Sequence, residues 1–134
     1  MKKKFRIEKD SIGNKKIENS CLWGAQTQRS LENFEIGIEK IPSEIIVAIG
    51  YQKKAAALTN IQLGKLDRKI GKAIIAACDQ IINSNLINHF PLSVWQTGSG
   101  TQTNMNANEV ISNYAIKTLK GKIGSKSPIH PNDH

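Results

Sequence analysis

Apolar residues recur with a helical period in three stretches of the chain, and the clearest of these covers residues 67–84. One face of a 3.6-residue helix would carry Ile70, Ile74, Ala77 and Ile81, opposite Arg68, Lys72, Asp79 and Asn83. Asp67 stands at the start of this stretch and has the side chain of a good N-cap. The spacing predicts a helix near 67–84 with one buried face.

The stretch 43–64 is apolar on nearly all sides. Pro42 and Glu44 suit the first turn of a helix, because proline is preset for that position and a carboxylate complements the helix dipole. Only Lys53 and Lys54 interrupt the apolar surface. We therefore expect a helix near 43–64 that is well buried.

A third helical pattern covers residues 104–120, with Gly121 as its stop. One face is apolar and consists of Ala107, Ile111, Ala115 and Leu119. Thr103 or Asn106 is placed to cap the start, and Asn106 followed three residues later by Glu109 resembles a capping box. The pattern predicts a helix near 104–120.

The first twenty residues alternate weakly between apolar and polar positions, as strands do. Phe5, Ile7 and Ile17 flank the turn-forming run 10–14, which predicts a small hairpin. The polar segment 23–37 shows no helical period, so we expect a connecting segment there. For its polar residues Gln26, Gln28 and Arg29 we expect only packing and hydrogen bonding, with no catalytic role. Together the patterns predict a mainly α fold with a small N-terminal β-hairpin.

The composition is that of one ordinary globular domain, with 134 residues, 39% of them hydrophobic and 22% charged. A formal net charge of +8 raises the question of nucleic-acid binding. The lysines are dispersed and aromatic residues make up only 5%, so a surface for stacking bases is not expected. A basic helical nucleic-acid-binding module is kept as an alternative, which a contiguous Lys/Arg stripe on one helix face would favour.

Cys21 and Cys78 are the only cysteines, and neither has a partner at metal-ligand spacing. We expect no disulfide, no zinc site, no metal and no cofactor, and reduced thiols as in a cytoplasmic protein. No run approaches the ~18 apolar residues that a membrane span needs, so no membrane association is expected.

The densest group of uncharged hydrogen-bond donors lies at residues 95–106. Gly98 and Gly100 flank Ser99, which lets the backbone turn tightly and expose its N–H groups. Ser99 and Thr101 add hydroxyl donors just before a predicted helix N-terminus, where free amides and the helix dipole favour anions. These residues indicate a site for a small carboxylate or phosphate. A loop that only caps the helix is the alternative.

The same stretch resembles the first signature region of class II fumarases, within the fumarase/aspartase superfamily. The matching string is WQTGSGTQTNMNANEV at 95–110, and further matching segments lie at 22–34, 90–92 and 130–134. The resemblance is collinear from about residue 5 to residue 134. Subunits of that family are several times longer. The resemblance therefore implies an N-terminal lyase domain at 1–134, with the family's central helical-bundle and C-terminal domains absent.

The resemblance also implies a function, the reversible hydration of fumarate to (S)-malate, with a small dicarboxylate as substrate and a homotetramer as the full-length assembly. It assigns Ser99, Gly100 and Thr101 to substrate binding, and His130, Pro131, Asn132 and Asp133 to a second anion site. Some relatives carry an arginine where this chain has Ser127, and Lys126 is the neighbouring candidate to replace it.

Aspartate ammonia-lyase is the nearest alternative activity. The segment 104–109 suits both enzymes, whereas the segment 95–97, Gln102 and His130 favour fumarase. No catalytic residue is expected within this chain. None of its three histidines has an evident orienting partner in the sequence. In the family the acid/base groups lie in later signature regions and come from neighbouring subunits.

Residues 1–134 alone are therefore expected to show no fumarate hydratase activity. The measurement is the absorbance of fumarate formed from malate by the purified chain, with a complete class II fumarase in the same buffer as the positive control. Turnover above the rate of buffer alone would contradict the assignment of the acid/base groups to other regions.

Overall fold

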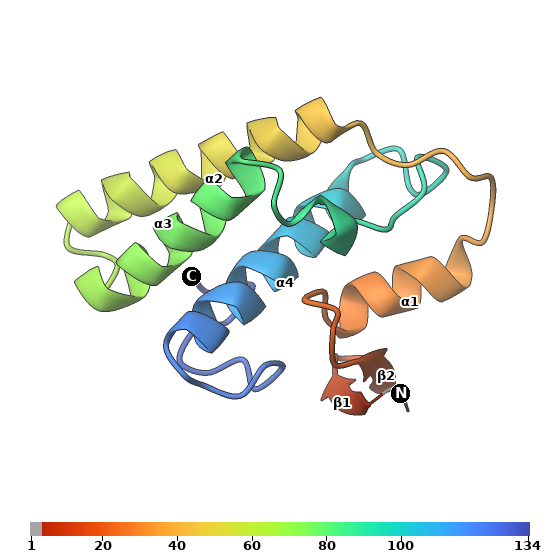
Figure 1. The fold of residues 1–134 in the computed structure, drawn as a ribbon, viewed down its shortest axis with the longest axis horizontal. Coiled ribbons are helices and arrows are strands. Elements are labelled where there is room, and N and C mark those ends of the chain that lie inside the picture. Colours follow the sequence, from red (N-terminus) through yellow and green to blue (C-terminus); the bar gives the residue numbers. More distant parts are fainter. Residues whose placement is uncertain (1–3) are drawn as a thin grey trace.

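The computed structural model describes residues 4–134, which form four α-helices, one short 3₁₀ helix and one two-stranded antiparallel sheet (Figure 1). In chain order the elements are β1 (Phe5–Lys9), β2 (Asn14–Glu18), α1 (Ala25–Asn33), α2 (Ser43–Gln62), α3 (Arg68–Ile82), η1 (Ile87–His89) and α4 (Thr101–Thr118). Helices α2 and α3 lie side by side, α4 crosses α3, and α1 and the hairpin lie on the other side of α4. The predicted mainly α fold with a small hairpin is confirmed. Within residues 4–134, no helix has the length and apolar character required to cross a bilayer.

The hairpin forms where the alternating pattern predicted it. Strand β1 pairs with β2 in a register that places Phe5 opposite Glu18. The carboxylate of Asp10 closes the turn by accepting the backbone N–H groups of Ile12 and Gly13, at 2.9 and 3.0 Å. Gly13 has φ +140°, a conformation that side chains disfavour, so glycine suits this end of the turn.

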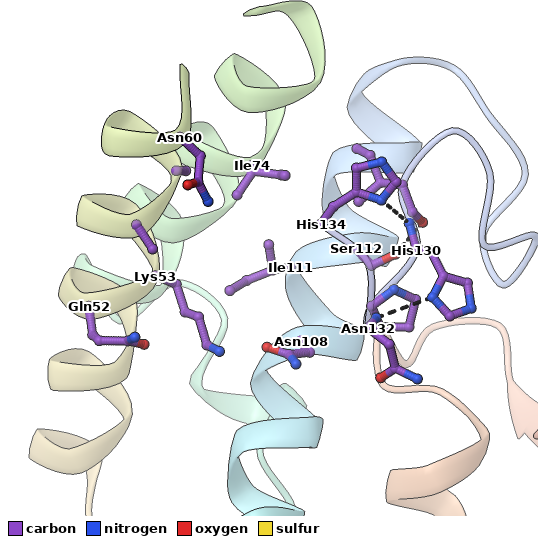
Figure 2. A pocket seen from close by; sticks show the side chains of 14 residues that line it. Gln52, Lys53, Asn60, Ile74, Asn108, Ile111, Ser112, His130, Asn132 and His134 are labelled. Atoms are coloured by element: carbon purple, nitrogen blue, oxygen red, sulfur yellow. Dashed lines mark hydrogen bonds between the residues drawn. The ribbon is translucent and has the colours of Figure 1, made fainter. Parts of the chain in front are cut away.

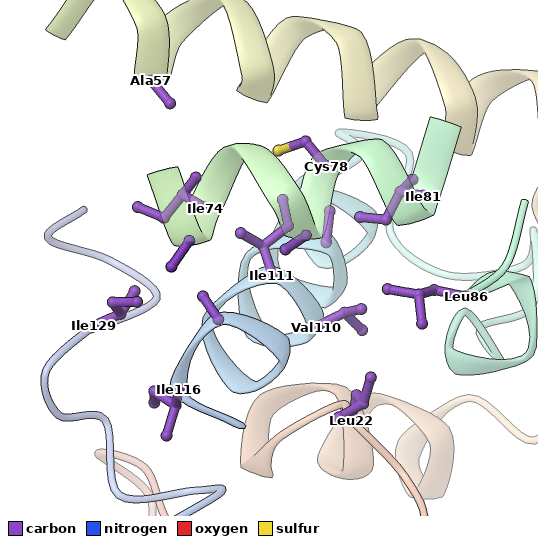
Figure 3. Close-up of a cluster of buried hydrophobic side chains, with 14 of the residues drawn as sticks. Leu22, Ala57, Ile74, Cys78, Ile81, Leu86, Val110, Ile111, Ile116 and Ile129 are labelled. Carbon is purple, nitrogen blue, oxygen red and sulfur yellow. The ribbon is translucent and has the colours of Figure 1, made fainter. Parts of the chain in front are cut away.

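Helix α3 confirms its prediction in both its cap and its buried face. The side chain of Asp67 accepts the backbone N–H groups of Lys69 and Ile70, both at 2.9 Å. Of the residues predicted to face inward, Ile74, Ala77 and Ile81 are buried in the main core, part of which Figure 3 shows, and Ile70 is partly buried against it. The core of α3 and α4 consists mainly of Ile74, Ala77, Cys78, Ile81, Val110, Ile111, Ala115 and Ile116.

Helix α2 has nearly the predicted bounds, but the prediction that it would be well buried is wrong. Only Ile46, Gly50 and Ala57 are buried. Ile45 and Leu58 stay exposed, because α3 and α4 contact the helix from one side only. A Cβ at Gly50 would lie 3.1 Å from a side-chain atom of Ile81, so glycine allows the close approach of α2 to α3.

Helix α4 begins at Thr101, three residues before the predicted start. Its N-cap is Gly100 in the left-handed conformation, with φ 72°, and no side chain caps the helix. The predicted caps Thr103 and Asn106 are therefore wrong, since both lie inside the first turns. The amide of Asn106 instead donates to the carbonyl of His89 at 3.0 Å.

The segment expected to be a connection contains helix α1, and the carboxylate of Glu109 explains why. Glu109 is 5% exposed and accepts the backbone N–H groups of Gly24, Gln26 and Thr27 at 2.8, 2.8 and 3.1 Å. These amides belong to the start of α1, which has no side-chain cap of its own. Glu109 thus caps another helix, and the predicted capping box with Asn106 is wrong.

Replacing Glu109 should destabilise the fold. Glu109→Gln turns an NH₂ group toward a buried backbone donor, and we expect it to lower the free energy of unfolding by about 1–3 kcal/mol. Glu109→Ala leaves three donors unpaired and should cost more. Urea denaturation measures both. The control is Glu44→Gln on the exposed start of α2, expected to change stability by about 0.5 kcal/mol or less. A Glu109→Gln variant as stable as this control would contradict the capping role.

His89 is partly buried between the start of α1 and α4. Its Nδ1 atom accepts the backbone N–H of Leu22 at 3.2 Å, and its ring meets that of Trp23 edge-on at 6.5 Å. Burial, followed by the charge of Lys117, holds the pKa of His89 below its ordinary value of 6.5. The fold therefore favours the neutral imidazole, whose Nδ1 can accept a hydrogen bond.

Stability should therefore fall on mild acidification. Between the folded and unfolded pKa values of His89 the unfolded chain binds more protons, so the free energy of unfolding decreases as the pH drops below 6.5. We expect His89→Gln to lose this part of the pH dependence while other groups titrate as before. Urea denaturation at pH values above and below 6.5 makes the comparison. Equal pH dependence in both proteins would show that the imidazole is not held neutral.

Candidate functional site

The predicted anion loop is a tight, exposed turn that leads directly into α4. Gly100 has φ 72°, and this left-handed conformation turns the chain between Ser99 and Thr101. The hydroxyl oxygens of these two residues lie 3.1 Å apart, so both project from the same turn. A Cβ at Gly98 or Gly100 would meet no atom within 4 Å, which leaves the approach to the backbone open.

The start of α4 adds backbone donors to these hydroxyls. No side chain caps the helix. The N–H of Asn104 donates to the carbonyl of Gly100 at 3.0 Å, as the first amide of the helix to reach back to its N-cap. The amides that precede Asn104 in the first turn stand at the positive end of the helix dipole. Hydroxyls, free amides and a dipole in one exposed turn can together hold a carboxylate. Residues 4–134 contain no group of three or more potential metal ligands.

A second loop supports the approach to this turn. The indole N–H of Trp95 donates to the carboxylate of Glu39 at 2.9 Å, and this bond is the main cause of the lowered pKa of Glu39. The backbone N–H of Val94 donates to the carbonyl of Glu39 at 3.0 Å, and the hydroxyl of Ser93 donates to the carbonyl of Ile36 at 2.8 Å. The segment before the anion turn is thereby fixed to the loop after α1.

An open hollow of about 300 Å³ lies beside the turn, and Thr101 is the one residue of its lining that the sequence analysis assigned to substrate binding. Arg29 and Asp10 line it together with Thr101 and Gln102. The guanidinium of Arg29 donates to both oxygens of Asp10, at 2.9 and 2.7 Å, and mainly for this reason the pKa of Asp10 falls to about 2. The hydroxyl of Ser30 hydrogen-bonds the side-chain oxygen of Gln102. These contacts connect the hairpin and α1 to the first turn of α4.

The segment predicted as a second anion site folds into a turn on the flank of α4. The backbone N–H of Asn132 donates to Nδ1 of His130 at 3.2 Å, and the same atom lies 3.3 Å from the carboxylate of Asp133. His130 thus has a neighbouring carboxylate that the sequence did not reveal. The hydroxyl of Ser112 donates to the carbonyl of the buried Ile129 at 2.8 Å, which anchors the turn to α4.

Tertiary structure adds a lysine to this second site. A pocket of about 190 Å³ separates α2 from the turn, and Figure 2 shows Lys53 and Asn108 on one side of it with His130 and Asn132 on the other. Burial lowers the pKa of Lys53. Asn108 and Ser112 lie about 10 and 16 Å along the axis of α4 from Thr101, so the structure keeps the two predicted sites apart.

Two residues assigned to this second site do not line its pocket. Lys126, the candidate to replace the missing arginine, donates from its ammonium to the carbonyl of Lys9 at 2.7 Å. Asp133 is exposed and touches His130 from outside. Lys53 was not found from the sequence because it lies on α2, whereas His130 and Asn132 lie on the final turn. No local pattern links these segments.

Comparisons with known proteins agree with the resemblance. Mitochondrial fumarate hydratase of Rhizopus oryzae is 58% identical over 133 residues, which cover 98% of this chain and 27% of that protein. Class II fumarate hydratase of Caulobacter vibrioides is 59% identical over 129 residues, or 96% of this chain and 28% of that protein. The chain therefore spans between 27% and 28% of the length of these relatives.

Solved structures show the same fold. The class II fumarase of Schistosoma mansoni matches with a TM-score of 0.93 at 41% identity, over 98% of this chain and 28% of that one. A fumarate lyase:delta crystallin of Brucella melitensis matches with a TM-score of 0.91 at 41% identity, over 97% of this chain and 31% of that one. A family model described as a lyase matches residues 13–134. This chain belongs to the lyase family that includes the class II fumarate hydratases.

Proposed function

We propose that this chain forms the carboxylate-binding part of a fumarate hydratase, which adds water reversibly to fumarate to give (S)-malate. The observation that carries the proposal is the open turn at Gly100, where two hydroxyls 3.1 Å apart meet the uncapped start of α4. The names of the relatives support a dicarboxylate substrate. Ser99, Gly100 and Thr101 bind one of its carboxylates.

The chemistry of the reaction explains why uncharged, fixed donors suit this position. In the dehydration direction a base removes a proton from the carbon next to a carboxylate, and negative charge then builds up on that carboxylate. Donors that are already aimed at its oxygens stabilise this charge without reorganising. The turn is fixed on both sides, by Trp95 and Glu39 before it and by the contact of Ser30 with Gln102 after it.

The second anion site is a separate part of the proposal. Lys53, Asn108, His130 and Asn132 together offer one cationic side chain and several hydrogen-bonding groups around a single pocket. A second dicarboxylate binds there, with Lys53 supplying the charge that some relatives take from an arginine. Pro131 shapes the turn, and Asp133 adds a carboxylate 3.3 Å from Nδ1 of His130.

The acid and base that move protons lie outside this chain in the proposed enzyme. Neighbouring subunits of a homotetramer complete each site, and the assembly works in the cytoplasm in the tricarboxylic acid cycle. The engagement of His89 supports placing the acid and base outside this chain, because its Nδ1 already accepts the N–H of Leu22 at 3.2 Å.

Removing a hydroxyl from the turn should weaken catalysis more than stability. In a complete fumarase that carries this sequence, Thr101→Val keeps the shape of the side chain and removes one donor. A hydrogen bond to a charged group contributes about 1.5–3 kcal/mol, so kcat/KM for malate should fall about ten- to a hundredfold. Ser99→Ala should behave alike. Steady-state kinetics and thermal melting measure the two effects.

Thr118→Val is the matched control, because its hydroxyl only donates to the carbonyl of Tyr114 at the far end of α4. Its kcat/KM should equal that of the unmodified enzyme. If Thr101→Val and Ser99→Ala both kept full kcat/KM while melting several degrees lower, the turn would be a structural helix cap and the proposal would be wrong.

A further inference from the structure

A shallow hollow with an apolar floor and a basic rim lies at the opposite end of α4 from the anion turn. Its volume is about 520 Å³. The floor is formed mainly by Ala73, Ala76 and Leu119, with Thr118 next to them, and the rim consists of Arg68, Lys69 and Lys72. The first half of α3 and the end of α4 meet here, at the same end of the molecule in Figure 1. We call it the α3–α4 hollow.

The positive charge of this rim is not compensated within the described part of the chain. Arg68, Lys69 and Lys72 are exposed, and no ion pair joins any of them to a carboxylate of residues 4–134. Asp67 is the one acidic residue between positions 45 and 78. Its carboxylate is already engaged by the backbone N–H of Lys69 and the next amide. Lys120, exposed and next to the floor residue Leu119 in sequence, adds to the excess.

Rim and floor follow one face of α3. Arg68, Lys72 and Ala76 succeed one another at intervals of four residues, and side chains at this spacing stack along a helix. A binding partner that lies along α3 would thus meet charge first and apolar surface next. All three basic residues of the rim lie on α3, and the end of α4 adds the apolar side chain of Leu119 beside them.

We propose that the α3–α4 hollow is a docking site for an acidic amphipathic segment of a partner protein. Apolar side chains of the segment contact Ala73, Ala76 and Leu119, and its carboxylates lie against Arg68, Lys69 and Lys72. Charge complementarity to the unpaired rim identifies this partner. Duplex nucleic acid would leave the apolar floor without a contact, and an anionic bilayer favours protruding apolar side chains over a concave floor.

The test uses a synthetic helical peptide of leucine and glutamate with one leucine face, labelled for fluorescence anisotropy. Residues 1–134 should bind it at low ionic strength and should not bind a peptide with glutamine in place of glutamate. The double variant Lys69→Glu/Lys72→Glu should weaken Kd about tenfold or more, because two attractions become repulsions. Glutamate suits the first turns of a helix, so α3 should remain folded by circular dichroism.

Two further variants separate specific docking from general attraction to a basic protein. Lys4→Glu/Lys9→Glu reverses the same amount of charge on the exposed hairpin, and Kd should stay within about twofold. Ala76→Gln leaves the charge unchanged but makes the floor polar, and it should weaken Kd about threefold or more.

Several results would overturn the proposal. Equal loss of affinity in the hairpin variant and the rim variant would show non-specific attraction. Equal binding of the glutamine peptide would show that charge does not direct the docking. Unchanged affinity of Ala76→Gln would show that the apolar floor does not contribute to it. Tighter binding of duplex DNA or of phosphatidylserine vesicles, lost in the rim variant, would assign the surface to another class of partner. None of these outcomes depends on fumarate hydratase activity.

Discussion

The buried carboxylate of Glu109 connects parts of the chain that are 82 to 85 residues apart. It satisfies three backbone donors at the start of α1, a helix of polar sequence that has no cap of its own. Burial raises the pKa of Glu109, whereas the N–H donors act in the opposite direction. Because the carboxylate and the N–H groups of Gly24 and Thr27 are buried, each would be costly to bury without the other. These hydrogen bonds fix the start of α1 against α4.

The first candidate anion site depends on that arrangement. Helix α1 presents Arg29 and Ser30 to the hairpin turn and to Gln102, so the first turn of α4 is held from outside as well as by its own hydrogen bonds. The middle of α4 carries Asn108 and Ser112 to the second pocket. A single straight helix thus fixes the separation of the two sites, and a rigid helix positions functional groups better than flexible loops do.

The net charge of +8 is distributed unevenly once the chain has folded. Arg29 and Lys54 are paired with carboxylates, and Lys53 is drawn into the second pocket. The basic side chains at the start of α3 remain unpaired among the described residues, next to the end of α4. The charge of this surface comes from α3 alone, since Arg68, Lys69 and Lys72 all lie near the start of that helix. The packing of α3 on α4 adds the apolar side chain of Leu119 next to this charge.

The sequence alone determined the features that depend on neighbouring residues. Periodicity located α2, α3 and most of α4, and Asp67 marked the start of α3. The motif around Ser99 identified the family and predicted an anion turn. Tertiary structure decided the rest: the existence of α1, the early start of α4 at Thr101 and the presence of Lys53 in the same pocket as His130. These features depend on contacts between distant segments. A buried acceptor or a facing helix supplies their stability, and no local pattern records which distant residue will provide it.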